Sequence, residues 1–327
     1  MNGRLEKELE CSAKMQKKLS GLPDVFTEYY YHLEADGKSY STLSNYVGHC
    51  VDFMVYFTNG INDNVFYEKV KATDINRYMA SIRHKEVNGK IIRTGDDIRA
   101  ARWTSLRAFF EFLKNNDDYH ISENPLDKTN RPRIKTEHKV TYLTKNEIDK
   151  VLNNIRMTAT KQKKSRDLCL VSLALSTGLR VSAITQINIE DIDFECNTIK
   201  VVEKGNKIRT INFGNNLGEL IWQCVIDREK YFAGADTNAL FLSQWKRRMT
   251  VQAVRDLVHK YTKCIAGKHI TPHKLRASAA TNLAASGVSI QAIARVLGHE
   301  NIQTTRRYVE VLDSETKAAT DILDNLI

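Results

Sequence analysis

Five residues of the chain have the types that a side-chain attack on a phosphodiester requires. In chain order they are Arg180, His273, Arg276, His299 and Tyr308. Each guanidinium can bond two oxygens of a phosphoryl group, and a tyrosine hydroxyl can act as a nucleophile. The two histidines can take up and return protons. The set therefore predicts an enzyme that breaks and rejoins DNA with its own side chains and without a metal ion.

A tyrosine nucleophile needs help from its neighbours. The pKa of an ordinary tyrosine hydroxyl is about 10, so at pH 7 only about one in a thousand is ionised. Tyr308 therefore needs a proton acceptor or positive charge beside it. The leaving group is a sugar alkoxide, which an acid must protonate. Lys204, at the tip of a turn over residues 203–207, is the candidate for that acid.

The segment before Arg276 predicts a helix whose first turn suits a phosphate. Thr271 is the expected N-cap and Pro272 the first helical residue, which places His273 in the first turn. Backbone N–H groups and the helix dipole favour an anion at that end. Arg276 follows one turn later on the same face.

The composition is that of a folded protein with a polyanionic partner. The chain has 327 residues, 42% of them hydrophobic and 27% charged, and its net charge is +10. The length favours two domains, and the positive charge favours a nucleic acid. The six cysteines are scattered without a CxxC pair, which argues against zinc and favours reduced thiols. We expect no metal and no cofactor.

No segment of the sequence is typical of a membrane protein. Residues 1–19 alternate charged and apolar types and lack the apolar core of a signal peptide. No apolar run approaches the roughly 20 residues that span a bilayer. The expected location is the cytoplasm, without a membrane partner.

The N-terminal part predicts a small all-α bundle. Apolar residues recur at helical spacing in four segments, 22–33, 41–57, 73–82 and 96–113. Short amphipathic helices of this kind bury their apolar faces against one another. We therefore predict a four-helix bundle within residues 21–127, preceded by an N-terminal extension over residues 1–20.

A basic linker is predicted over residues 128–140, after the Asn124-Pro125 break. Its basic residues are Lys128, Arg131, Arg133, Lys135 and Lys139. With one acid and almost no apolar residues, the segment favours phosphate contacts where two domains clamp duplex DNA. A merely solvated linker is the alternative. The five basic residues form the predicted DNA-binding set.

The folded pattern resumes at residue 141. Thr144 and Glu147 form a capping box at the start of one helix, and a second helix covers about residues 166–176. The period then changes to two, which predicts short strands at 191–194, 198–203 and 207–213, with 239–243 as a further candidate. The chain after Thr250 is predicted to be helical.

The predicted fold class is therefore mainly α. The N-terminal four-helix bundle is followed by a C-terminal, mostly helical domain over residues 141–312 that contains a small antiparallel β-sheet. Residues 313–327 are predicted to form a further amphipathic helix. This helix packs either on its own protomer or on a neighbouring protomer.

The order and spacing of the chemical residues resemble those of the tyrosine recombinases, also called phage-type integrases, with an Xer-like two-domain layout. The matching motifs are Thr-Gly-Leu-Arg, Lys-Gly-Asn-Lys-x-Arg, His-x-x-Arg and Leu-Gly-His, followed by the tyrosine. The matching catalytic residues are Arg180, Lys204, His273, Arg276, His299 and Tyr308. The motifs cover residues 141–312, while the N-terminal bundle resembles a core-binding domain in architecture only.

The resemblance implies a site-specific recombinase. Tyr308 would form a 3′-phosphotyrosyl link to DNA, and the strands would be exchanged through a Holliday junction without ATP. The implied partners are double-stranded recombination sites, three further copies of the chain in a tetramer and an accessory directionality factor. Residues 313–327 would be exchanged between protomers.

One residue departs from the family pattern. The family usually has Glu or Asp three residues after the first arginine, where this chain has Ala183. That carboxylate ordinarily helps to orient the basic groups of the site. Its absence predicts either a less firmly held Arg180 or another acid in the same task.

Three other interpretations compete with the recombinase. Residues 284–298 are similar to a helix-turn-helix, which predicts a DNA-binding regulator with Thr304, Thr305 and Arg306 on a recognition helix. That hypothesis explains neither Arg180 nor Lys204. A type IB topoisomerase shares the chemistry but not the Xer-like spacing. A catalytically idle relative would only bind and bend DNA, and Ala183 is the sole hint of one.

Overall fold

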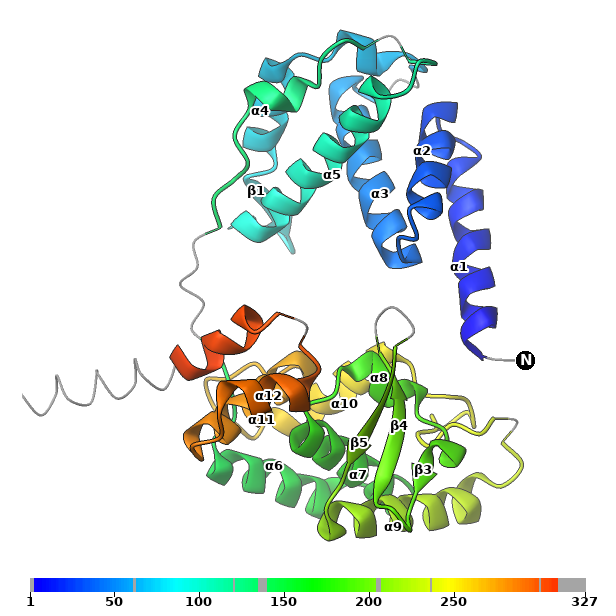
Figure 1. Cartoon of the computed structure of the whole chain (residues 1–327), viewed down its shortest axis with the longest axis vertical. Coiled ribbons are helices and arrows are strands. Elements are labelled where there is room, and N and C mark those ends of the chain that lie inside the picture. The colour runs from blue at the N-terminus through cyan, green and yellow to red at the C-terminus, as the bar shows by residue number, and fades with distance from the viewer. Residues whose placement is uncertain are drawn as a thin grey trace, which may run out of the picture. The chain divides into compact units, whose positions relative to one another are not determined.

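The computed structural model describes residues 3–60, 63–119, 121–134, 140–203, 207–235, 237–299 and 301–310. The chain divides into two compact units, residues 1–138 and 139–327. Both units consist mainly of helices, as the sequence predicts, and each also contains a small antiparallel sheet, which was predicted for the second unit only (Figure 1). None of the helices within the described ranges is long and apolar enough to span a bilayer.

The first unit is a helical bundle. Its helices are α1 (Gly3–Leu19), α2 (Asp24–Ala35), α3 (Tyr40–Phe57), α4 (Ala72–Ser81) and α5 (Asp96–Lys114). The last four match the predicted segments. The region expected as an extension is helix α1, and its Met15 and Leu19 are buried in the core of this unit. These residues lie one turn apart, so they share the face that packs on the bundle.

A β-hairpin interrupts the first unit where the sequence analysis expects none. Strands β1 (His84–Val87) and β2 (Lys90–Arg93) pair antiparallel around Asn88-Gly89. Both turn residues have positive φ, 51° and 73°, as a type I′ turn requires. The strands are exposed along their whole length, so they lack the alternation of apolar residues on which strand prediction depends.

Aromatic rings fill the core of the first unit. Phe109 of α5 lies at the centre, with ring centroids 5.6 Å from Phe26, 5.1 Å from Tyr29 and 6.3 Å from Phe66. The short helices η1 (Phe66–Lys69) and η2 (Pro125–Lys128) close the bundle through buried Phe66 and Leu126. Stacked and edge-on rings of this kind add to the stability that burial provides.

The second unit is also mainly helical. They are α6 (Lys145–Thr158), α7 (Lys161–Thr177), α8 (Val181–Gln186), α9 (Asn215–Phe232), α10 (Val251–Thr262), α11 (Pro272–Ala285) and α12 (Ile290–Leu297). Residues 303–310 are also helical. The predicted capping box of Thr144 and Glu147 is present at the start of α6. Helix α9 is not among the segments that the sequence analysis assigns.

A three-stranded antiparallel sheet lies between α8 and α9 in the chain. Its strands are β3 (Ile192–Asp193), β4 (Thr198–Val202) and β5 (Ile208–Asn212), in the order β3-β4-β5. Ile199 pairs with Ile211 and both are buried, which fixes the register. The candidate strand at 239–243 forms isolated bridges only, at Ala239 and Leu242, and does not join this sheet.

Helix α7 forms the centre of the second unit. Its residues from Leu168 to Val171 are all buried, so the helix is surrounded by other elements. It packs on α9 and α11. The end of this rigid helix leads directly into the Thr-Gly-Leu-Arg segment, so a buried scaffold positions that part of the candidate site.

We predict that Phe109→Ala destabilises the first unit by about 3–5 kcal/mol, because it removes a ring at the centre of the aromatic core. The control is Tyr31→Ala, since Tyr31 is 48% exposed. That variant should change the stability by less than about 1 kcal/mol. Urea unfolding followed by the fluorescence of Trp103, with Trp222 and Trp245 replaced by Phe, measures this unit. Equal midpoints for the two variants would contradict the assignment of Phe109 to the core.

Candidate active site

The Thr-Gly-Leu-Arg segment makes a sharp turn at the end of α7. Gly178 adopts a left-handed conformation with φ 60°, and its N–H donates to the carbonyl of Ala174. A Cβ at Gly178 would lie 2.4 Å from Cδ2 of Leu297, so glycine also makes room for the neighbouring segment. Leu179 is buried, and Arg180 becomes the N-cap residue of α8. The turn thus places Arg180 at the surface of the core.

Arg276 is a buried clamp between two helix ends. Its side chain is 3% exposed, and its Nη1 and Nη2 donate to the carbonyls of Gly178 and Leu297, each at 2.7 Å. Carbonyls at helix C-termini lack partners in their own helix and carry partial negative charge. Burial, and then the positive charge of Arg180, lower the pKa of Arg276 to about 10. The guanidinium therefore remains charged at pH 7.

The Leu-Gly-His segment ends α12 in a Schellman motif. The N–H groups of Gly298 and His299 donate to the carbonyls of Arg295 and Ala294. Gly298 has φ 66°, and a Cβ there would lie 2.6 Å from Oε2 of Glu203. The motif turns His299 back beside the clamp of Arg276.

Tyr308 lies against His299 on the helix formed by residues 303–310. The two ring centroids are 6.4 Å apart and the rings are 20° from parallel. Tyr308 is only 2% exposed and packs with Ala277, Ala280 and Leu297. Its hydroxyl is within electrostatic reach of Arg276. The predicted nucleophile therefore lies beside the predicted phosphate-binding residues.

The electrostatic environment keeps both histidines neutral at pH 7. Partial burial, followed by the charges of Arg276 and Arg180, lowers the pKa of His299 to about 4. The pKa of His273 is lowered as well, by partial desolvation of its ring and then by Arg276. Nδ1 of His299 lies 2.8 Å from the hydroxyl of buried Thr305. If that hydroxyl donates to Nδ1, Nε2 carries the proton and can donate to a phosphate.

The structure brings together five of the six predicted catalytic residues. Arg180, His273, Arg276, His299 and Tyr308 come from α8, α11, the end of α12 and the helix at 303–310, and their charges act on one another. The sixth, Lys204, lies outside the described residues, as do Lys135, Lys139 and the segment 313–327. Arg131 and Arg133 are exposed in a stretch without regular structure. Lys128 pairs with Glu123, whose hydrogen bond raises the pKa of the lysine.

Four residues at the site were given no catalytic or positioning role in the prediction from the sequence. They are Glu203, Arg209, Thr305 and Arg307. Glu203 accepts from Nη1 of Arg180 at 3.3 Å and from Nη2 of Arg209 at 3.4 Å. The exposed Arg307 also lowers the pKa of both histidines. The alanine at position 183 was a signal for Glu203, because it left the first arginine without its usual acid.

The structure does not favour the helix-turn-helix hypothesis. Thr305 is fully buried and faces His299, so it is unavailable for contact with DNA bases. The residues of α11 from Leu275 to Thr281 are also buried. These helices form a packed support for His299 and Tyr308.

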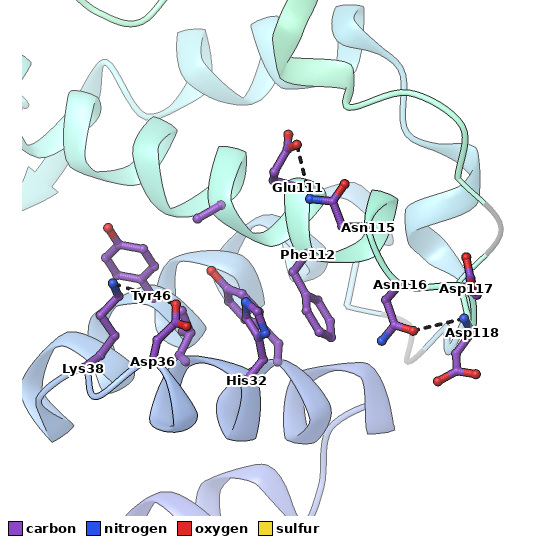
Figure 2. A pocket seen from close by; sticks show the side chains of 13 residues that line it. His32, Asp36, Lys38, Tyr46, Glu111, Phe112, Asn115, Asn116, Asp117 and Asp118 are labelled. Atoms are coloured by element: carbon purple, nitrogen blue, oxygen red, sulfur yellow. Dashed lines mark hydrogen bonds and ion pairs between the residues drawn. The ribbon is translucent and has the colours of Figure 1, made fainter.

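A cleft in the first unit contains none of these residues. It has a volume of about 730 Å³, and His32, Asp36, Glu111 and Asp118 are among the residues that line it (Figure 2). Its carboxylates would repel a phosphate. The candidate site is therefore the cluster around Arg276, which is a surface suited to a large polyanion.

We predict that acid destabilises the second unit partly through His299. In the folded chain the pKa of His299 is about 4, below the value of about 6.5 in an unfolded chain. The unfolded state therefore binds more protons between these values, and the stability falls as the pH falls from 6.5 to 4. In urea unfolding at pH 7 and pH 5, His299→Gln should lose less stability than the wild type. An equal loss in both proteins would contradict the lowered pKa.

The chain is similar to known proteins over most of its length. The model of the phage integrase family matches residues 141–315. The tyrosine recombinase XerC of Caldanaerobacter subterraneus subsp. tengcongensis is 34% identical over 255 residues, covering 77% of this chain and 68% of the relative. The tyrosine recombinase XerC of Leptospira interrogans is 26% identical over 283 residues, covering 86% of each.

Solved structures share the fold. The XerH site-specific recombinase bound to its palindromic difH substrate aligns with a TM-score of 0.68 at 19% identity, covering 86% of this chain and 80% of that one. A lambda integrase dimer bound to a COC′ core site aligns with a TM-score of 0.66 at 17% identity. The alignment covers 91% of this chain and 80% of that one. The family model, the relatives and the helical fold with its small sheet lead to one conclusion: the chain belongs to the phage integrase family, the family of the tyrosine recombinases.

Proposed function

We propose that the chain is a site-specific DNA recombinase that cuts and rejoins duplex DNA through a covalent 3′-phosphotyrosyl link on Tyr308. The observation that carries this proposal is the position of Tyr308, which lies beside His299 and within electrostatic reach of Arg276. A phosphate bound by the arginines would therefore lie close to a nucleophile. The relatives named tyrosine recombinases support the same function.

The first step exchanges one ester for another. The hydroxyl oxygen of Tyr308 bonds to phosphorus, the bond from phosphorus to the 5′-oxygen breaks, and the tyrosine proton passes to His273. Lys204 donates a proton to the departing oxygen, which leaves as a 5′-hydroxyl. The phosphotyrosine keeps the energy of the broken ester, so a 5′-hydroxyl can reverse the step without ATP. The residues alone supply the groups that the step needs, so we propose that it requires no metal ion.

The arginines and His299 stabilise the negative charge of the transition state. The hydrogen bonds to Gly178 and Leu297 use two of the five N–H donors of Arg276. They also fix the plane of the guanidinium, in which the three remaining N–H groups point. Arg180 is 40% exposed, so it can reach a phosphate at the surface. Neutral His299 would add an N–H donor. Such fixed donors are most effective where charge develops during the reaction.

The lowered pKa of His273 suits a proton acceptor. A neutral imidazole can accept the tyrosine proton, whereas an imidazolium cannot. Desolvation lowers this pKa most, and the charges of Arg276 and Arg180 lower it further, so the residues that bind phosphate also help to keep the base neutral. The burial of Tyr308 requires a movement of the helix at 303–310, or of its side chain, before attack.

The partners that we propose are two double-stranded recombination sites and further copies of the chain. Strand exchange requires two duplexes, and a tetramer would supply one nucleophile for each of the four strands. The exposed Arg131 and Arg133 would contact phosphates as the chain closes around DNA. Residues 313–327 would pass to the neighbouring protomer.

We predict that Tyr308→Phe abolishes covalent attachment to DNA, with a loss of at least about 10³-fold, because phenylalanine has no nucleophilic oxygen. The substrate is a pool of nicked duplexes with randomised sequence, and adducts are separated on a denaturing gel. The control is Tyr231→Phe in the same unit, which should form adduct at the wild-type rate. Wild-type binding without an adduct would contradict the proposed reaction, and an adduct in Tyr308→Phe would contradict the nucleophile.

We predict that Arg131→Gln with Arg133→Gln weakens DNA binding and its dependence on salt. Each phosphate contact contributes about 0.9 to the slope of log K against log salt, so the double variant should lose about 2 from that slope. Lys69→Gln is the control, because Lys69 lies outside the predicted DNA-binding set and is paired with Asp63 at 2.8 Å. Fluorescence anisotropy at several salt concentrations measures both. An unchanged slope in the double variant would show that the segment is merely solvated.

A further inference from the structure

We propose that Glu203 is the positioning residue that holds Arg180 for phosphate binding, in place of the acid that is missing at position 183. This inference rests on the proposed function. It assigns to Glu203, the residue after β4, the role of the missing acid, which the sequence alone leaves open.

Glu203 is a partly buried carboxylate between two guanidiniums. Its side chain is 10% exposed, and Oε1 accepts from both Arg180 and Arg209. Its N–H donates to the carbonyl of Lys207, which ties its backbone across the end of the β4–β5 hairpin. The carboxylate is therefore held by the sheet, not by the flexible reach of a surface side chain.

Arg209 connects Glu203 to the rest of the site. Its Nη1 donates to the carbonyls of Arg295 and Val296, at 2.8 and 2.9 Å, in the last turn of α12. The next carbonyl, that of Leu297, accepts from Arg276. One carboxylate thus couples Arg180 to the helix end that holds Arg276 and His299.

Position 183 cannot supply an acid without disturbing the core. Ala183 is 2% exposed and belongs to the main apolar cluster of the second unit. A carboxylate there would displace packed neighbours or be buried without water. Glu203 follows the end of β4 and accepts a hydrogen bond from Arg180. In this chain the acid therefore comes from position 203, and alanine occupies position 183, where the family usually has the acid.

Gly298 provides the space that this arrangement needs. Oε2 of Glu203 and Cζ of Arg209 would lie 2.6 and 3.1 Å from a Cβ at that position. The glycine of the Leu-Gly-His motif therefore serves two purposes, a left-handed turn and room for the ion pair. The close packing also limits the positions that Glu203 can adopt.

The electrostatic consequences give the proposal a sharp test. A negative charge beside the phosphate site should weaken DNA binding if it did nothing else. If it positions Arg180, its removal should instead slow cleavage while leaving DNA binding unchanged or tighter. A misplacement of about 1 Å in such a site can cost about 100-fold in rate.

The test variant is Glu203→Gln, which keeps the shape and removes the charge. We expect adduct formation on nicked duplex DNA to slow by about 10–100-fold at saturating protein, with no loss of affinity. The matched control is Glu147→Gln, because Glu147 is also partly buried and paired, with Lys268 at 2.7 Å, and glutamine still suits its capping box. That control should cleave at the wild-type rate.

A double-mutant cycle with Arg180→Lys separates positioning from a general effect on the fold. If Glu203 acts through Arg180, the loss caused by Arg180→Lys should be several-fold smaller in Glu203→Gln than in the wild type. Multiplicative losses, or a Glu203→Gln rate equal to or above that of the wild type, would overturn the proposal. If thermal unfolding shows that Glu203→Gln is not folded, the same cycle with Glu203→Asp decides. A wild-type chain that forms no adduct would instead contradict the proposed function.

Discussion

The pair of hydrogen bonds from Arg276 to Gly178 and Leu297 is the interaction on which the site depends. A buried guanidinium is costly unless its donors are satisfied, and the carbonyls at two helix ends satisfy this one. The same bonds join the end of α7 to the end of α12. Arg180 follows the first end and His299 follows the second, so one buried cation sets the distance between the parts of the site.

Crowding of positive charge determines the chemistry of the other groups. Partial burial, and then the charges of Arg276 and Arg180, lower the pKa of both histidines, which makes them neutral donors and acceptors at pH 7. The same positive charges favour the binding of a phosphate. Arg180 and Arg209 carry like charges, which repel each other. The carboxylate of Glu203 accepts hydrogen bonds from both and offsets part of that repulsion. A site of this kind is adapted to a polyanionic substrate.

Much of this arrangement could be predicted from the sequence, because it depends on local signals. Thr144 and Glu147 mark a helix start by their spacing alone, and the period of two near Ile199 and Ile211 marks paired strands. The order of the predicted catalytic residues along the chain indicates the family. Glu203 could not be assigned in this way, since its contact with Arg180 spans 23 residues and depends on the register of the sheet. The exposed hairpin at Asn88-Gly89 was missed because it has no apolar pattern, although its turn residues are diagnostic.

Tyr308 is the residue that we propose becomes joined to DNA. Mass spectrometry of the covalent complex after digestion with nuclease and protease tests this attachment. We expect a nucleotide attached through phosphate to the side-chain oxygen of Tyr308 in the peptide that contains it. A nucleotide on any other residue of the chain would show that Tyr308 is not the nucleophile.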